Sequence, residues 1–372
     1  MPRPLTPLWL TAPSRFATLS PTVARWALGV LTLLLAASLS ALIAPAPSTN
    51  SRGSSAQADT MGDIVLYESI VSGVHAGGNY YAVAAAALRS GNYPLRPFVA
   101  FRLPTLAMVQ SLLPPTLTII LLYALAAGVF LAWFFRLRDA LAGALPRAVA
   151  LILLAGGMAA FVQSALIGFH ETWAGLLIAL SLALRRPGRW VDAAAFGMMA
   201  MLVRETAALF VVLMAGAALI EGRRREAYGW AATLALFAVV VTLHAYAVSQ
   251  VVRPLDPTSP GWSGLLGFGF FVQTMTVSTA LLLAPSWLAA LLVGLSLFGW
   301  ATWRDPLAAR ALAVFVAYAA LLALFGRVDT FYWGLMIAPT MLIGLAFAPD
   351  GVRDLMNAAR AARKITITRL TR

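Results

Sequence analysis

Residues 117–135 read LTIILLYALAAGVFLAWFF, a continuous run without a charged side chain. A transmembrane helix needs about 20 mostly apolar residues, so this run is long enough to cross a membrane. Segments 26–43 and 228–248 have the same character. Strands of a membrane barrel would alternate in polarity over about ten residues, so these continuous runs indicate membrane-spanning helices.

The composition of the whole chain agrees with a membrane protein. Hydrophobic residues make up 61% of the 372 residues and charged residues 11%, whereas soluble domains are roughly half apolar and a quarter charged. The absence of cysteine excludes disulfides and makes structural zinc or iron–sulfur sites unexpected. The three histidines, His75, His170 and His244, are far apart in the sequence. We therefore expect no metal site and no cofactor.

Apolar runs separated by basic residues predict an all-α polytopic membrane protein, a single membrane domain over residues 1–372. The first run is longer than the apolar core of a cleaved signal peptide, about 7–15 residues, and predicts an uncleaved anchor. About ten transmembrane helices are expected, at residues 24–44, 114–135, 147–168, 170–184, 190–203, 205–220, 227–248, 280–302, 307–325 and 330–347.

The distribution of charge predicts the orientation. With the N-terminus in the cytoplasm, most of the 27 Lys and Arg residues fall on the cytoplasmic side, as the positive-inside rule requires. The net charge of +13 is then concentrated there, and residues 348–372 form a basic cytoplasmic tail. Such a basic rim suits anionic lipid headgroups and does not indicate nucleic-acid binding. We expect a multi-pass protein of a bacterial inner membrane, with both termini cytoplasmic.

Residues 190–220 are expected to form a hairpin that turns at Arg204-Glu205. One continuous helix would measure about 46 Å, which exceeds the membrane core of about 30 Å. Two short helices reach only about 22 Å each, so their turn lies below the outer surface. Arg204 and Glu205 would then point into a cavity, as would His170 and Glu171 at another tight turn. The alternative is that these charged residues only form turns and reach for headgroups.

The first outer loop, residues 45–115, carries a carboxylate directly after the first expected span. Asp63 precedes an apolar stretch, which predicts a helix N-cap and a short amphipathic helix lying on the membrane. A second helix is expected over 80–88, and a third apolar segment, 98–113, is expected to be interfacial because Arg102-Leu103-Pro104 interrupts it. Such helices can form the floor of a pocket open to lipid.

These features resemble the GT-C superfamily of membrane glycosyltransferases. The resemblance rests on Gly-Asp-x-x-x-Tyr at residues 62–67, the interfacial helices, Tyr93-Pro94 and the charged tip at 203–206. It covers about residues 24–250, including the first outer loop, whereas the C-terminal helices 251–347 are generic. The resemblance implies a polyprenyl-phosphate-linked sugar as donor and a carboxylate of the first outer loop as catalytic base. Ile64 stands where the family often has a second acidic residue.

Transfer from such a donor needs a general base for the acceptor hydroxyl and cations for the departing phosphate. Asp63 is the expected base. The other candidates for catalysis are Glu68 and Glu171; for the phosphate Arg204, Arg327, His170 and Arg102; and for the sugar or acceptor Tyr67, Tyr80, Tyr93, Glu205, Asp329 and Tyr332.

Structural alternatives remain for several of these candidates. Asp63 could serve only as a helix cap, and Arg204 could only pair with Glu205 or Glu171. Arg327 and Asp329 could satisfy one another. The tyrosines and Trp262 could belong to an interfacial aromatic belt.

The sequence thus predicts an inverting glycosyltransferase that acts at the periplasmic side of the membrane. The acceptor would be a hydroxyl of a glycan, lipid or protein. The second long outer loop, residues 249–278, would cap the cavity or hold the acceptor. The competing hypotheses are a ten-span transporter of small molecules or lipids and a noncatalytic assembly or lipid-binding protein. Outer charges gathered at one face favour a one-sided site, whereas transporters place their sites near the midplane.

Overall fold

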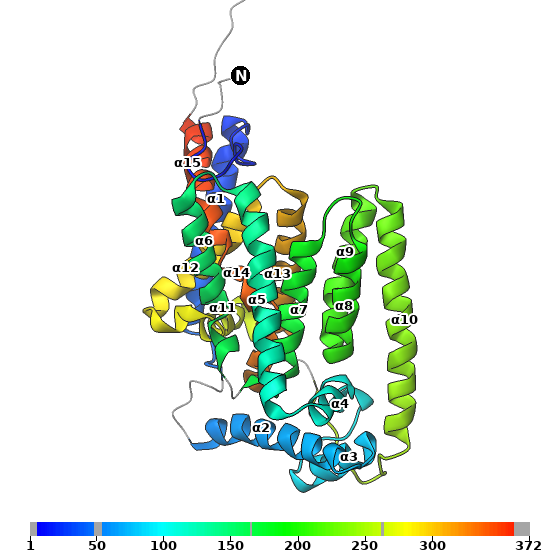
Figure 1. The fold of residues 1–372 in the computed structure, drawn as a ribbon. Coiled ribbons are helices and arrows are strands. Elements are labelled where there is room, and N and C mark those ends of the chain that lie inside the picture. Colours follow the sequence, from blue (N-terminus) through cyan, green and yellow to red (C-terminus); the bar gives the residue numbers. More distant parts are fainter. Residues whose placement is uncertain (1–5, 48–53, 164–165, 262–263, 361–372) are drawn as a thin grey trace, which may run out of the picture.

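The regular elements of the described chain are all helices (Figure 1). The computed structural model describes residues 6–47, 54–163, 166–261 and 264–360. Within these residues, four helical stretches are long and apolar enough to cross a membrane, and η8 with the helices after it makes a fifth candidate that is bent by 60°. The chain is therefore a helical, multi-pass membrane protein. The four stretches are α1 with η1 (Pro21–Ser38 and Leu39–Leu42), α5 (Pro115–Ala140), α10 (Arg224–Ser249) and α13 (Pro306–Phe325).

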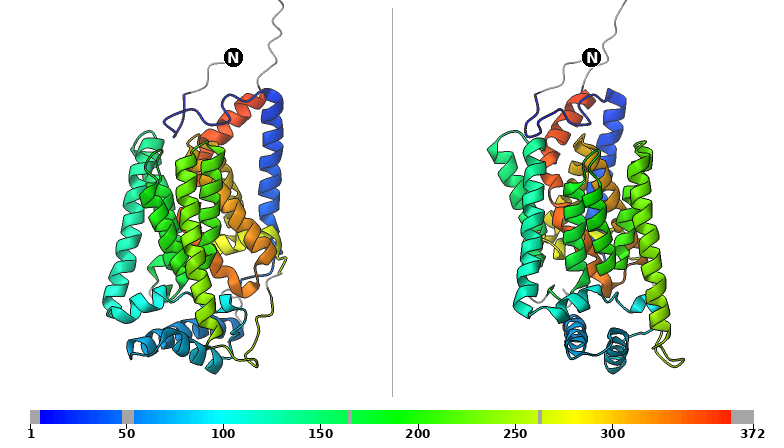
Figure 2. Two further views of the ribbon diagram at one scale, coloured as in Figure 1. Left: turned by 90° about the vertical axis from the view of Figure 1, so that its right-hand side faces the viewer. Right: turned by 45° about the vertical axis from the view of Figure 1, so that its right-hand side comes forward.

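Shorter apolar helices account for most other expected spans and run alongside the long ones in the bundle (Figures 1 and 2). Expected span 147–168 is shorter in the structure, because its α-helix ends at Gly157 and a 3-10 turn follows. Expected span 280–302 is broken, with its α-helix beginning only at Ser286. The short elements are α6 (Ala144–Gly157), η4 (Ala159–Val162), α7 (His170–Leu184), α8 (Val191–Val203), η6 (Glu205–Ala207), α9 (Ala208–Ile220), η7 (Ala280–Leu283) and α12 (Ser286–Thr302).

The predicted hairpin at Arg204 is confirmed. Helix α8 ends at Val203, Arg204 has extended backbone angles, and η6 begins at Glu205. The break places a charged residue with no exposed surface at the tip of two short helices.

The last expected span, 330–347, differs most from its prediction. It is divided among η8 (Val328–Met336), α14 (Ala338–Met341) and α15 (Gly344–Arg360), and α15 continues well past residue 347. Within α15 the buried Asp350 carboxylate accepts hydrogen bonds from the backbone N–H groups of Leu8, Trp9 and Leu10, at 2.7–2.9 Å. The first part of the expected tail therefore packs against the N-terminal segment, and residues 361–372 lie outside the described residues.

Helix α7 forms the centre of the bundle, with every residue from His170 to Ala183 buried. It lies so close to η8 that a Cβ atom built on Gly175 would be 2.2 Å from the Leu335 carbonyl oxygen. Glycine at this position therefore permits the close approach of the two segments.

The helices of the segment expected to form the first outer loop, here called the outer-loop helices, lie across one end of the bundle (Figures 1 and 2). Asn79 caps the second of them by accepting hydrogen bonds from the N–H groups of Tyr81 and Ala82. Leu66 and Ile70 of the first helix pack in one buried cluster with residues of the second. The elements are α2 (Ser54–His75), α3 (Tyr80–Ser90), η3 (Phe98–Ala100) and α4 (Thr105–Leu112).

The second outer loop, expected over 249–278, contains a helix within the bundle. Helix α11 (Gly267–Val277) buries Phe270, Phe271 and Val272 completely. The loop before it is fastened to the first outer loop by Asp256, whose carboxylate accepts two hydrogen bonds from Arg89, at 2.8 and 2.7 Å. Trp262 lies outside the described residues.

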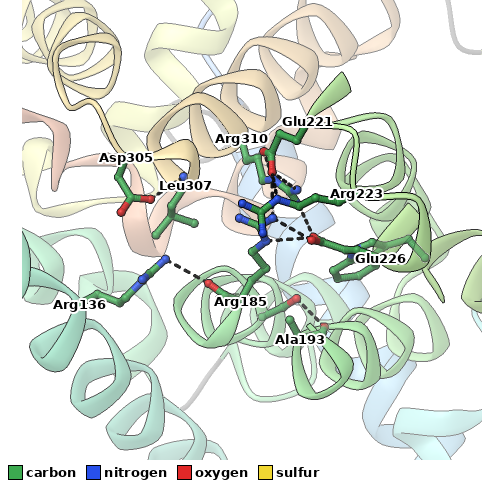
Figure 3. Close-up of polar contacts among 11 residues, drawn as sticks. Arg136, Arg185, Ala193, Glu221, Arg223, Glu226, Asp305, Leu307 and Arg310 are labelled. Carbon is green, nitrogen blue, oxygen red and sulfur yellow. Dashed lines mark hydrogen bonds and ion pairs between the residues drawn. The ribbon is translucent and has the colours of Figure 1, made fainter. Parts of the chain in front are cut away.

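A buried ion network joins three segments at the opposite end of the bundle (Figure 3). Glu226 contacts Arg185 at 2.8 Å and Arg310 at 2.7 Å, and all three side chains are at most 2% exposed. Glu221 also contacts both arginines, at 3.0 and 2.8 Å. The network thereby ties the end of α7 and the turn between α9 and α10 to the first turns of α13.

Candidate functional site

A cavity of about 470 Å³ lies between the outer-loop helices and the end of the bundle. Nine of the sequence-predicted residues line it, although they come from segments far apart in the chain. Uncharged polar residues line it too, among them Asn92, Gln110 and Ser259. The nine are Asp63, Tyr67, Tyr80, Tyr93, Arg102, His170, Arg327, Asp329 and Tyr332.

Asp63 lies within α2, so the prediction that it caps a helix is wrong. Its half-buried side chain lines the cavity and accepts a hydrogen bond from the side chain of Tyr93. Burial raises the pKa of the Asp63 carboxyl above its usual range, although the Tyr93 hydrogen bond and the charge of Arg102 oppose this. Gly62 leaves room for Tyr93, because a Cβ atom at Gly62 would be 3.0 Å from the tyrosine hydroxyl oxygen.

Glu68 does not belong to the cavity wall. Its side chain is exposed, on the same helix as Asp63. Five residues of an α-helix correspond to a rotation of about 140° from the starting face, so the two carboxylates point in different directions. The structure therefore separates Glu68 from the other candidates.

Arg102 lies on the cavity wall in the irregular segment between η3 and α4. Its Nε–H donates to the Tyr67 hydroxyl at 3.3 Å, and the Tyr80 hydroxyl donates to its carbonyl oxygen at 2.7 Å. Its guanidinium nitrogens are 4.0 Å from Glu171 and 3.7 Å from Glu205. Arg102 therefore lies between the cavity and two charged residues behind its wall, Glu171 and Glu205.

Behind that wall, Arg204 is paired with the two glutamates. Its Nε is 2.5 Å from Glu171 Oε1, and its Nη1 contacts Glu205. Neither Arg204 nor these glutamates are among the residues that line the cavity. Within the described part of the chain, Arg204 Nη2, Glu171 Oε2 and Glu205 Oε2 are buried without a hydrogen-bond partner. This arrangement corresponds to the ion-pair alternative considered for Arg204.

His170 begins α7 and contributes an imidazole to the cavity wall. Its ring packs edge-on against Tyr67, with the ring centroids 5.1 Å apart. Neither ring nitrogen has a hydrogen-bond partner among the described residues, although the side chain is buried. A neutral imidazole has one donor and one acceptor, so His170 can bind a group such as a hydroxyl that has both.

Arg327 and Asp329 occupy the turn that begins η8, on another side of the cavity. They form an ion pair at 2.9 Å with side chains 35% and 44% exposed. Ion pairs this accessible to solvent contribute little to stability, about 0–1 kcal/mol. Arg327 could therefore leave Asp329 and bind an anionic ligand at little cost in stability.

A strap, residues 250–260, contributes Ser259 and Pro260 to the cavity wall. The hydrogen bonds from Arg89 lower the pKa of Asp256 to about 2, so this carboxylate stays ionised at ordinary pH. Arg96 donates two further hydrogen bonds to the Asp256 carbonyl oxygen, at 3.1 and 2.8 Å. No local sequence signal identifies Ser259, Asn92 or Gln110 as cavity residues, because only long-range packing brings them there.

His244 is buried and contacts the Tyr81 hydroxyl at 3.1 Å. Within the described residues, no group of three or more histidines and carboxylates could hold a metal ion.

Comparison with known proteins finds no relative: no protein-family model, no curated protein and no solved structure matches the chain.

Proposed function

We propose that the chain is a membrane glycosyltransferase of the GT-C type. It moves a sugar from a polyprenyl-phosphate carrier to an acceptor hydroxyl, with inversion, at the outer face of a bacterial inner membrane. The observation that carries this proposal is the shared cavity of Asp63, Arg102 and Arg327, which joins a carboxylate base to two cations. The short helices of the bundle complete ten crossings, and both termini face the cytoplasm.

Asp63 is the proposed base. A general base is most effective when its pKa approaches the working pH, and burial shifts the Asp63 pKa upward in that direction. Its hydrogen bond with Tyr93 fixes the carboxylate on the cavity wall. Deprotonation of an acceptor hydroxyl by this carboxylate allows attack on the anomeric carbon of the donor, and the phosphate leaves.

Arg102 and Arg327 are the proposed partners of that phosphate. Arginine presents a permanently charged planar fork that matches phosphate oxygens. Both line the cavity, whereas Arg204 contacts two glutamates and supports Arg102 from behind. His170 and the tyrosines supply hydrogen bonds and apolar ring faces for the sugar.

The location of the cavity suits a donor with a lipid tail. The cavity lies where the outer-loop helices meet the ends of the bundle, so a polyprenyl chain can remain in the bilayer while its phosphate reaches Arg102. A transporter would place its site near the midplane. The position of the cavity at one end of the bundle therefore favours transfer chemistry over transport. The acceptor is a glycan, lipid or protein hydroxyl.

Donor turnover by purified protein tests this proposal. The protein is reconstituted in nanodiscs with radiolabelled polyprenyl-phosphate hexoses and pentoses and a membrane extract as acceptor source, and release of polyprenyl phosphate is followed. Asp63→Asn should reduce turnover by about 10²–10⁴-fold, the usual contribution of a general base. Glu68→Gln is the matched control on the same helix and should keep full turnover.

Binding and pH dependence separate the roles of the residues. Asp63→Asn removes a negative charge beside the phosphate, so donor affinity should stay unchanged or increase, whereas Arg102→Gln should weaken it. In the wild type, kcat/KM should decrease as the pH is lowered through the raised pKa of Asp63. Full turnover by Asp63→Asn would eliminate it as the base. Solute flux in proteoliposomes without donor consumption would overturn the proposed function.

A further inference from the structure

A second cavity lies at the end of the bundle that carries both described chain ends, away from the outer-loop helices. Its volume is about 310 Å³, at the lower end of the range of about 300–1,000 Å³ for small-molecule sites. We call it the terminal niche. It is lined by Leu10, Thr11, Ala12, Pro13, Arg136, Asp139, Ala140, Trp303, Arg304 and Asp305.

The terminal niche contains a buried cation that forms no close ion pair among the described residues, although the charges of Asp305 and Asp139 act on it from a distance. Arg136 is only 9% exposed, and its Nη2 donates to the carbonyl oxygen of Arg185 at 3.1 Å. In the described residues no partner is found for its buried Nε, and no carboxylate lies within ion-pair distance of its guanidinium. A buried guanidinium group without a directly contacting anion is costly. A bound anion would remove that cost.

The two acidic residues of the niche have their closest contacts elsewhere and form no ion pair with Arg136. Asp305 caps α13, where its Oδ1 accepts a hydrogen bond from the Leu307 N–H at 2.8 Å. Figure 3 shows no contact between Asp305 and Arg136. The Asp139 side chain is 60% exposed and lies 3.9 Å from Arg186. The niche therefore keeps separate positive and negative groups on its wall.

This separation favours a zwitterion over a simple anion. Arg136 and Arg304 can contact phosphate oxygens, while the two carboxylates can accept hydrogen bonds from an ammonium group. Arg136 lies in the last turns of α5, a helix long enough to span the membrane, and Trp303 also lines the niche. Trp and Arg at helix ends are typical of the lipid headgroup layer.

We propose that the terminal niche binds a phosphoethanolamine group, with its phosphate on Arg136 and Arg304 and its amine facing Asp139 and Asp305. The lipid headgroup of the adjacent leaflet and free phosphoethanolamine share this chemistry. The site is independent of the outer cavity and of any activity there.

Native mass spectrometry of the full-length, delipidated protein tests the site. The probes are dilauroyl phosphatidylethanolamine, phosphatidylcholine and phosphatidylglycerol, free phosphoethanolamine, and inorganic phosphate. The wild type should bind the ethanolamine lipid about tenfold more tightly than the choline lipid, which has no N–H donor, and than the glycerol lipid, which has no amine. Arg136→Gln should weaken binding of the ethanolamine lipid by about tenfold or more. Arg138→Gln, an exposed position two residues further along the same helix, should leave it unchanged.

A second variant covers the case in which Arg136→Gln fails to fold. Asn also caps helices, so Asp305→Asn keeps the start of α13 while it removes the negative charge. This variant should lose the preference for ethanolamine over choline. Free phosphoethanolamine that competes as well as the lipid would support the site with a soluble ligand. Equal binding of all phospholipids, equally tight binding of inorganic phosphate alone, or unchanged binding by both variants would overturn the proposal.

Discussion

The buried ion network around Glu226 gives the sharpest prediction on stability. The Glu226 carboxylate accepts hydrogen bonds from Arg185 at 2.9 and 2.8 Å and from Arg310 at 2.7 Å. Glu226→Gln retains the size of the side chain but removes its charge, which leaves two buried guanidinium groups undercompensated. Breaking a buried ion pair by removing one partner costs about 3–5 kcal/mol.

The lower end of this range applies here, because Glu221 still contacts both arginines. We therefore expect the free energy of unfolding to decrease by about 3 kcal/mol. For domains of 150–250 residues this corresponds to a decrease in the apparent Tm of about 6–12 °C, and the decrease should be somewhat smaller for this longer chain. The assay is thermal unfolding of the purified protein in one detergent at a fixed heating rate, because unfolding of such proteins is commonly irreversible.

Glu221→Gln is the matched control. Its side chain is 22% exposed, against 2% for Glu226, so water can replace part of the lost interaction. The decrease in apparent Tm should therefore be clearly smaller than for Glu226→Gln. Equal decreases for the two variants, or an unchanged Tm for Glu226→Gln, would refute the argument that burial determines the cost.

Two further substitutions test other parts of the structure. Gly175→Ala would place a Cβ atom 2.2 Å from the Leu335 carbonyl oxygen and should destabilise the protein by about 1–3 kcal/mol. Gly128→Ala is the control, because a Cβ atom there would meet nothing within 4 Å, and it should not destabilise the protein. Equal Tm values for the two variants would contradict the close packing of Gly175. The pKa of Asp256 is lowered to about 2 by Arg89, so its contribution to stability is present above its ordinary pKa of 3.8 and is lost as the pH falls towards 2. At a fixed pH above 5, protease cleavage of the strap should therefore be faster in Asp256→Asn than in the wild type, and equal cleavage rates would remove the fastening role of Asp256.

The sequence predicted the hairpin at Arg204 correctly because two simple constraints determine it. An apolar run that is too long for the membrane must turn, and the charged pair at its centre marks the only place where a turn costs little. Length and charge are properties of a local segment, so they can be read without knowledge of the packing. The same reasoning correctly located the four helical stretches that are long and apolar enough to cross a membrane.

The interpretation of Asp63 as a cap failed for the opposite reason. The Ser- and Gly-rich residues before it indicate a loop, yet α2 begins at Ser54 and passes through Asp63. Helix interiors disfavour Asp only weakly, by well under 1 kcal/mol, and the helix is stabilised by packing of Leu66 and Ile70 against α3. Tertiary contacts of this kind are not visible in a local pattern, and neither is the packing that brings Gln110 and Ser259 to the cavity.

The two ends of the bundle use the same residue types for different purposes. At the Glu226 end, the buried Glu226 carboxylate and the two buried guanidinium groups are matched by contacts from several directions, which is what a stabilising network requires. At the end that carries the outer-loop helices, the imidazole nitrogens of His170 and single atoms of Glu171 and Arg204 have no hydrogen-bond partner within the described chain. Buried polar atoms rarely remain unsatisfied without a reason. Since His170 lines the 470 Å³ cavity, a polar ligand that carries both a donor and an acceptor is the addition that would pair its imidazole nitrogens.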